Sequence, residues 1–161
     1  MKPVSRAGGL AFALAAIVAI LDQAAKSWIV DGLRLTPGVP QPLFGPLRLT
    51  LVENAGVSFG LLQSGGWARW ALAGFALTVA AALAWWVRRA ERLYTGVALG
   101  LVIGGAIGNF LDRVRFGTVV DFVDVTQLRF PWVFNLADSA ITIGIVLLLI
   151  EGLFTGKRET A

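Results

Sequence analysis

The reactive side chains of this sequence are almost all carboxylates. The 161 residues include no Cys and no His, so thiol nucleophiles, imidazole bases, disulfides and the usual zinc and haem ligands are missing. We therefore expect chemistry by carboxylates, lysine, hydroxyls or amides, with no metal and no cofactor. Two Asp held close together cannot both ionise cheaply, so they share a proton and can act on one water as acid and base.

Two groups of polar residues stand at helical spacing beside apolar runs. Asp22 and Lys26 are four residues apart, on one helix face, where a structural ion pair would neutralise both charges. Asn109 is followed by Asp112 and Arg113, and the arginine can fork onto a carboxylate and fix its position. The plain alternative for Asp112 is a salt bridge.

Asp121 and Asp138 are the candidates for an acid and base pair, because the expected topology returns both to one end of the molecule. Spacing alone leaves Asp124 open in place of Asp121. The structural alternatives are a helix N-terminal acid at 138 and exposed strand-edge charges at 121 and 124. A nucleophilic pair of Ser139 and Lys26 is also conceivable.

Four apolar stretches are long enough to position these groups across a membrane. The composition, 57% hydrophobic and 15% charged, is too apolar for an ordinary soluble domain. About 20 helical residues cross a hydrocarbon core. We expect one all-α membrane domain over residues 1–161, with spans at about 8–30, 67–87, 94–111 and 136–154.

Basic residues predict the orientation of these spans. Lys and Arg precede the first span, follow the fourth and fill the turn between the second and third, which places both termini in the cytoplasm. The connections 31–66 and 112–135 then lie outside. A cleavable signal peptide at the first span is a competing interpretation, and it would discard Asp22. Seven of the ten acids fall on or near the outer side: Asp22, Asp31, Glu53, Asp112, Asp121, Asp124 and Asp138.

The first outer connection carries a repeated pattern. Leu-Arg-Leu-Thr occurs at 33–36 and again at 47–50, which predicts a small antiparallel sheet resting on the membrane surface, with an irregular loop as the alternative. Asn54-Ala55-Gly56 is typical of a turn, and 57–62 is a short apolar segment suited to the interface. In the third span, Gly104 and Gly108 predict close helix packing.

Five ordered blocks of the sequence resemble the lipoprotein signal peptidases, the signal peptidase II family. A single block would be weak, but together they cover nearly the whole chain. They are Asp22-Gln23-Ala24-Ala25-Lys26, Asn54-Ala55-Gly56-Val57-Ser58-Phe59, the run from Gly104 to Arg113, Val119-Val120-Asp121-Phe122 and Phe134-Asn135-Leu136-Ala137-Asp138.

The resemblance implies four transmembrane helices, an extracytoplasmic β-cradle and a short peripheral helix. It implies an aspartic peptidase of the bacterial inner membrane that cuts a prolipoprotein signal peptide before its diacylglyceryl-modified Cys. It selects Asp121 over Asp124, so the catalytic pair would be Asp121 and Asp138. The supporting residues would be Asn54, Gly56, Asn109, Asp112, Arg113 and Asn135, with Asp22 and Lys26 mainly structural.

Other functions remain as alternatives to this peptidase. A small ion- or proton-coupled transporter would also use buried acids, but near the bilayer midplane and in related repeats. A non-catalytic assembly subunit is a third possibility. We expect lipid and prolipoprotein as partners, a monomer, and no nucleic acid, since the basic residues cluster beside apolar spans.

Overall fold

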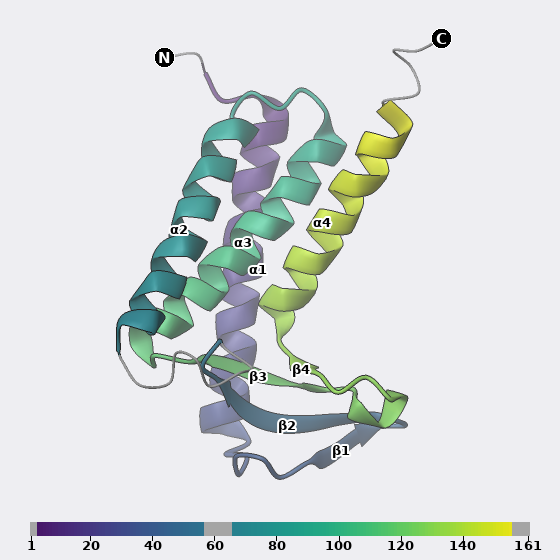
Figure 1. Ribbon diagram of the computed structural model, residues 1–161. Coiled ribbons are helices and arrows are strands. Elements are labelled where there is room, and N and C mark those ends of the chain that lie inside the picture. The colour runs from purple at the N-terminus through teal and green to yellow at the C-terminus, as the bar shows by residue number, and fades with distance from the viewer. Residues whose placement is uncertain (1–2, 57–65, 156–161) are drawn as a thin grey trace.

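Four long helices dominate the computed structural model, which describes residues 3–56 and 66–155 (Figure 1). Each of these helices is long and apolar enough to cross a membrane. The third continues past the expected residue 111 as far as Arg115, so its polar residues lie within the helix. The elements are α1 (Arg6–Ser27), continued by a π-helical turn η1 (Trp28–Gly32), α2 (Trp67–Val87), α3 (Leu93–Arg115) and α4 (Leu136–Thr155).

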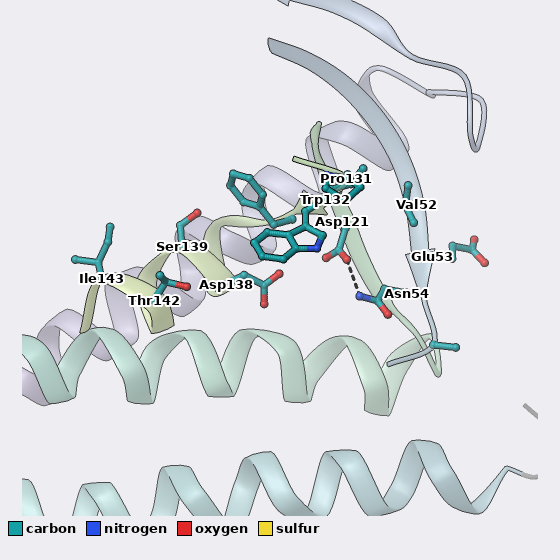
Figure 2. Close-up of a pocket in the computed structure, with 13 residues that line it drawn as sticks. Val52, Glu53, Asn54, Asp121, Pro131, Trp132, Asp138, Ser139, Thr142 and Ile143 are labelled. Atoms are coloured by element: carbon teal, nitrogen blue, oxygen red, sulfur yellow. Dashed lines mark hydrogen bonds between the residues drawn. The ribbon is translucent and has the colours of Figure 1, made fainter. Parts of the chain in front are cut away.

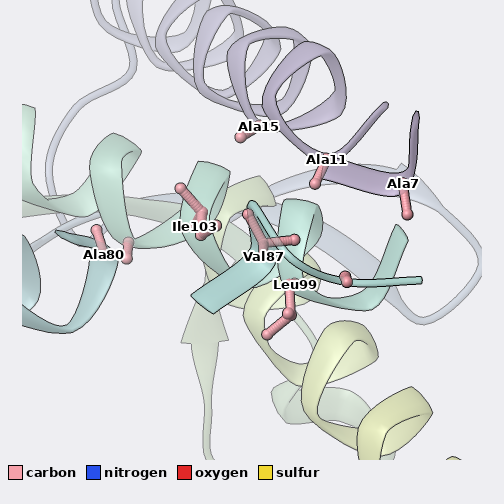
Figure 3. Packing of buried hydrophobic residues seen from close by; sticks show 9 residues of the cluster. Ala7, Ala11, Ala15, Ala80, Val87, Leu99 and Ile103 are labelled. Carbon is pink, nitrogen blue, oxygen red and sulfur yellow. The ribbon is translucent and has the colours of Figure 1, made fainter. Parts of the chain in front are cut away.

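Helix α3 is the centre of the bundle and packs against α1, α2 and α4. An ideal Cβ at Gly104 would lie 2.7 Å from the backbone oxygen of Ala15, and one at Gly108 would lie 2.6 Å from Asp22 Oδ2. The close packing predicted from these two glycines is confirmed. Small side chains of α1 fill the same interface, and the buried cluster in Figure 3 includes Ala7, Ala11, Ala15, Ala80, Val87, Leu99 and Ile103.

The outer helices present apolar faces to their surroundings. In α2 and in α4, only 17% of an apolar stretch of 18 residues is buried inside the protein, whereas the corresponding share in α3 is 61%. Tryptophans mark both ends of α2, where Trp67, Trp70, Trp85 and Trp86 are each more than half exposed. Apolar side chains between two aromatic belts suit a helix surrounded by lipid.

A four-stranded antiparallel sheet lies at the end of the bundle opposite the start of α1 and the end of α4 (Figure 1). The apolar side chain of Ile29 in η1 packs into its core with Leu51 and Phe122, which joins the sheet to the helices. The sheet expected from sequence is thus confirmed. Its strands, in spatial order, are β1 (Gln41–Phe44), β2 (Leu47–Asn54), β3 (Val119–Asp124) and β4 (Val133–Phe134), with a 3₁₀ turn η2 (Thr126–Leu128) before β4.

The prediction of a strand at 33–36 was wrong. The first helix continues through η1 to Gly32, and Arg34 then takes a positive φ of 50°, which no regular strand allows. Strand β2 pairs with β1 on one side and with β3 on the other, and Pro42 is tolerated in β1 because β1 is an edge strand. The repeated Leu-Arg-Leu-Thr pattern therefore marked one strand rather than two.

The turn predicted after β2 is present. The Gly56 N–H donates to Asn54 Oδ1 at 2.7 Å, and Gly56 has a φ of 85°, a conformation that favours glycine. This turn fixes the direction of the Asn54 side chain. The interfacial segment expected at 57–62, including the implied peripheral helix, lies outside the described residues.

Candidate active site

A pocket of about 930 Å³ opens where the sheet meets the start of α4 (Figure 2). Asp121 of β3 and Asp138 of α4 both line it, and Figure 2 shows their carboxyl groups directed toward the same space beside the Trp132 indole. Two acids from separate elements of the chain thus meet in one cavity. The other lining residues are Val52, Glu53, Asn54, Ala55, Pro131, Val133, Phe134, Ser139, Thr142 and Ile143.

Asp121 is held by two asparagines, one in β2 and one between β4 and α4. In the sheet register it faces Val52, so Asn54 lies two residues further along β2 and can reach it. Asn54 Nδ2 donates to Asp121 Oδ2 at 2.9 Å, and Asn135 Nδ2 donates to Asp121 Oδ1 at 2.7 Å. The Asp121 side chain is buried, with 2% of its surface exposed, so these amides replace most of its contact with water.

Asp138 lies in the first turn of α4 and caps the helix together with Asn135. Asn135 Oδ1 accepts from the Asp138 N–H at 2.8 Å, while Asp138 Oδ2 accepts from the Asn135 N–H at 3.4 Å. This reciprocal arrangement is a capping box. The expected role of Asp138 at a helix N-terminus is therefore confirmed, and it leaves Oδ1 to accept from Asn109 Nδ2 at 2.7 Å.

Burial raises the pKa of Asp121 from its ordinary value of 3.8 to about 6. The hydrogen bond from Asn54 opposes this rise, the negative charge of Asp138 adds to it, and Asn135 and the charge of Lys26 oppose it. A carboxyl group with a pKa near neutrality can either hold or release a proton under physiological conditions. The pocket therefore contains a group suited to acid–base chemistry.

A buried ion cluster lies beneath the pocket. Lys26 Nζ contacts Asp22 Oδ2 at 2.7 Å and Asp112 Oδ2 at 2.8 Å, and both acids have fully buried side chains. Asp22 also accepts from the Ala137 N–H, and Asp112 from the Val120 N–H. The predicted Asp22–Lys26 pair and the salt bridge at Asp112 are confirmed, and together they join α1, α3, β3 and α4.

Other candidates occupy places that differ from the sequence prediction. Arg113 donates to the backbone oxygen of Asn109 at 3.1 Å, and within residues 3–56 and 66–155 it forks onto no carboxylate. Ser139 donates to the Asn135 backbone oxygen at 3.0 Å, whereas the Lys26 ammonium is engaged by the buried acids and Asn109, so a Ser139–Lys26 pair does not form. Arg113 and Ser139 thus bind backbone oxygens, so among the described residues the expected fork of Arg113 onto a carboxylate is not formed and the alternative Ser139–Lys26 pair is excluded.

Asp121 and Asp124 are not exposed edge charges, because each is only 2% exposed. Burial works to raise the pKa of Asp124, but hydrogen bonds from Thr126, Thr50 and Arg48 outweigh it and hold that pKa well below its usual range. Asp124 is thus a structural acid whose ionised form is stabilised by its hydrogen bonds, and it does not line the pocket. Asp121 alone of the two lines the cavity.

Comparison with known proteins decides the family. Residues 14–154 match the family model described as signal peptidase (SPase) II, which covers most of the chain. The chain belongs to the signal peptidase II family. A lipoprotein signal peptidase of Caulobacter vibrioides is 50% identical to it over 157 residues, which cover 97% of this chain and 94% of the relative. One of Methylorubrum extorquens is 43% identical, covering 86% and 82% of the two chains.

Solved structures support the same conclusion about the fold of this signal peptidase II. A bacterial membrane enzyme determined by the in meso method at 2.3 Å resolution has a TM-score of 0.81 and 30% identity, covering 98% of this chain and 95% of that one. A second, at 1.9 Å, has a TM-score of 0.80 and 32% identity, covering 95% and 97%. The helix bundle and the sheet are therefore the arrangement of solved relatives.

Sequence reasoning missed two features in and around this pocket. Gln23 bridges the ion cluster, since its Nε2 donates to Asp112 Oδ1 at 2.7 Å; its place between Asp22 and Lys26 was the available signal. Trp132 lines the pocket although it belongs to no block that carried the resemblance. Among the described residues, no cluster of three or more acids is placed to hold a metal ion.

Proposed function

We propose that this signal peptidase II is an aspartic endopeptidase that removes the signal peptide from diacylglyceryl-modified bacterial prolipoproteins, cutting before the lipidated Cys. The main support for this proposal is that Asp121 and Asp138 line one pocket and that asparagine amides donate hydrogen bonds to both. The family membership and the relatives named lipoprotein signal peptidases support the same substrate class.

The two acids divide the work of hydrolysis. Two carboxyl groups held close together in one pocket share a proton, so one is ionised and the other neutral. The ionised member takes a proton from a water as that water attacks the scissile carbonyl, and the neutral member gives its proton to the carbonyl oxygen. The C–N bond of the resulting diol then breaks; the acid that took the water proton gives it to the leaving amine, and the other acid regains a proton from a diol hydroxyl. The asparagine amides keep both carboxyl groups oriented for these transfers.

The position of the pocket suits a lipid-anchored substrate. It opens beside the first turns of α4, whose exposed face carries large apolar side chains such as Ile143 and Val146. With the basic turn at 88–92 in the cytoplasm, this end of the bundle faces the outer side of the inner membrane. A lipidated signal peptide can then bring its cleavage site to the acids while its acyl chains stay in lipid.

The direct test is cleavage of a synthetic peptide by the purified protein in detergent or lipid. We expect a diacylglyceryl-modified peptide to be cut before the modified Cys, and the same peptide without lipid to be cut at least about 10²-fold more slowly, because remote binding energy positions the reacting bond. Mass spectrometry of the products identifies the bond. Failure to cleave the lipidated peptide, together with cation uptake by proteoliposomes, would instead favour the transporter.

Asn54→Ala is expected to shift the pH dependence of cleavage. Asn54 donates to the ionised form of Asp121 and so lowers its pKa, which means that loss of this hydrogen bond moves the pKa upward from about 6. The limb of the kcat/KM profile that reports Asp121 therefore moves to higher pH. The other charges acting on Asp121, from Asp138, Lys26 and Arg113, are unchanged in this variant.

Thr50→Val is the matched control for the Asn54 variant. Thr50 lies on the same strand and donates to Asp124 Oδ2 at 2.6 Å, so this change removes the same kind of hydrogen bond from the other buried acid of β3. We expect the pH profile of Thr50→Val to coincide with that of the parent. A shift in the control equal to that of Asn54→Ala would mean that the effect comes from the sheet and not from Asp121.

A further inference from the structure

The side chain of Lys26, on α1, is separated from the candidate catalytic acid Asp138 by a single side chain, that of Asn109. Its ammonium donates to Asn109 Oδ1 at 3.3 Å and is almost fully buried. Asn109 lies on α3 between this cation and the pocket, and its Nδ2 donates to Asp138 Oδ1 at 2.7 Å. A single amide group therefore connects the buried cation with one of the two acids.

The chemistry of an ammonium group determines which way this amide faces. An ammonium has three donors and no acceptor, so Asn109 must present its oxygen to Lys26 and its NH₂ to Asp138. Asn135 Nδ2 also contacts Asn109 Oδ1, at 3.2 Å, but that NH₂ is shared with Asp121 and with the Val120 backbone oxygen. Lys26 is the charged donor in this set, and charged donors make the stronger hydrogen bonds.

The direction of the amide limits where a proton can lie. Asn109 Nδ2 donates to Asp138 Oδ1 at 2.7 Å, whereas the Asn135 N–H lies 3.4 Å from Oδ2, so the stronger donor occupies Oδ1 and a proton on Asp138 is favoured on Oδ2. A reversed amide would instead present its oxygen to Asp138 Oδ1 and accept a hydrogen bond from a proton on that oxygen. The orientation of Asn109 therefore decides which oxygen of Asp138 is favoured to carry a proton.

We propose that Lys26 is a positioning residue of the active site, whose ammonium fixes the Asn109 amide so that Asp138 Oδ1 is held as a hydrogen-bond acceptor. This inference rests on the proposed function, because it concerns the protons of Asp121 and Asp138. This positioning role comes in addition to the structural role of Lys26 in the ion pair with Asp22. Neither Lys26 nor Asn109 lines the pocket, so both act on turnover rather than on substrate binding.

The test removes the donor without leaving buried charges unpaired. Lys26→Met alone would leave the carboxylates of Asp22 and Asp112 without their cation, so we combine it with Asp22→Asn and Asp112→Asn in a charge-neutral triple variant. The same three changes are then made in an Asn109→Leu background. Cleavage of a diacylated peptide gives kcat and KM for all four proteins, and thermal unfolding shows that each is folded.

We expect the triple variant to lose about 10- to 100-fold in kcat with KM within about twofold of the parent, the cost of a misplaced catalytic group. In the Asn109→Leu background the same changes should lower kcat by less than about threefold, because the residue through which Lys26 acts is gone. A merely structural Lys26 predicts equal losses in both backgrounds, and that result would overturn the proposal.

Asn109→Leu by itself keeps the proposal testable even when the triple variant does not fold. It should lower kcat without raising KM, and full turnover in this single variant would rule out any action of Lys26 through Asn109. Asp138→Asn, measured in the same assay, separates this inference from the proposed function. Retained turnover in Asp138→Asn refutes the aspartic pair itself, whatever the result at Lys26.

Discussion

Asp121→Asn and Asp138→Asn are each expected to lower kcat/KM for a diacylated peptide by about 10²- to 10⁴-fold, the contribution of a positioned acid or base. Asparagine keeps the size of the side chain but cannot exchange a proton at physiological pH. At 138 the new side chain can still accept from the Asn135 N–H, so the helix cap is kept. The loss is therefore chemical, and KM should change little.

Both aspartate variants need a check on folding, because both oxygens of Asp138 also accept from amide donors, Asn109 Nδ2 and the Asn135 N–H. Both oxygens of Asp121 accept from amide donors, and the turn at Gly56 prevents Asn54 from reversing its amide. An asparagine at 121 therefore sets one donor against another, which costs about 1–3 kcal/mol. Thermal unfolding of the purified variant measures this cost separately from the rate of cleavage.

Ser139→Ala is the control for both aspartate variants. Ser139 lines the same pocket one residue after Asp138, but its hydroxyl donates to the Asn135 backbone oxygen within the helix. We expect this variant to keep kcat within about threefold of the parent, a change of less than about 1 kcal/mol in the barrier. Loss of activity in Ser139→Ala with normal turnover in either aspartate variant would replace the aspartic mechanism by a serine mechanism.

The helices were predictable because lipid imposes a simple length rule. The second span was placed at 67–87 as observed, since Gly66 precedes it and arginines follow it. The third was ended too early because Asn109, Asp112 and Arg113 were assigned to the outer interface. Their partners are side chains and backbone groups of the protein, so the helix continues through them. Polar residues in a span mark internal contacts as readily as its end.

The meeting of the two acids could not be derived from the sequence by spacing. Asp121 and Asp124 are three residues apart on one strand and point to opposite faces, but both faces of β3 are buried. The alternation of buried and exposed residues along a strand therefore cannot show which of the two acids faces the pocket. Only the fold shows that Asp121 faces α4 and that Asp124 faces Thr50 and Arg48.

The capping of α4 explains why Asp138 admits both a structural and a catalytic interpretation. Its backbone N–H and Oδ2 serve the helix cap with Asn135, and its Oδ1 faces Asn109. The sequence Asn135-Leu136-Ala137-Asp138 has the spacing of a capping box, so the amino acids themselves predict this half of the role. What the spacing could not supply was the partner from α3, which lies 29 residues earlier in the chain.

Lys26→Met is expected to destabilise the protein by about 3–5 kcal/mol, the usual cost of removing one partner from a buried ion pair. Asp22 and Asp112 have fully buried side chains, and Lys26 is the cation that contacts both. Without it, two carboxylates face each other in a site that water does not reach. Thermal unfolding in detergent, followed by tryptophan fluorescence, should show a Tm lower by about 6 °C or more.

Arg92→Met is the matched control, because it removes a cation from an ion pair at the opposite end of the bundle. Arg92 lies 3.5 Å from Glu151, and its side chain is 58% exposed. Exposed pairs contribute about 0–1 kcal/mol, so Tm should fall by no more than about 4 °C. A Tm for Lys26→Met as close to the parent as that of this control would contradict the buried-cluster argument.

The charge-neutral triple variant separates charge from shape in the same cluster. Asn at 22 and 112 can still accept from the Ala137 and Val120 N–H groups, and Met fills most of the volume of the lysine stem. Because replacing a buried ion cluster by neutral groups is often harmless to stability, we expect the triple variant to recover most of the Tm lost in Lys26→Met. A triple variant that is stable again but slow in turnover, with a much smaller loss in the Asn109→Leu background, would show that the lysine acts on chemistry through Asn109 and not through folding.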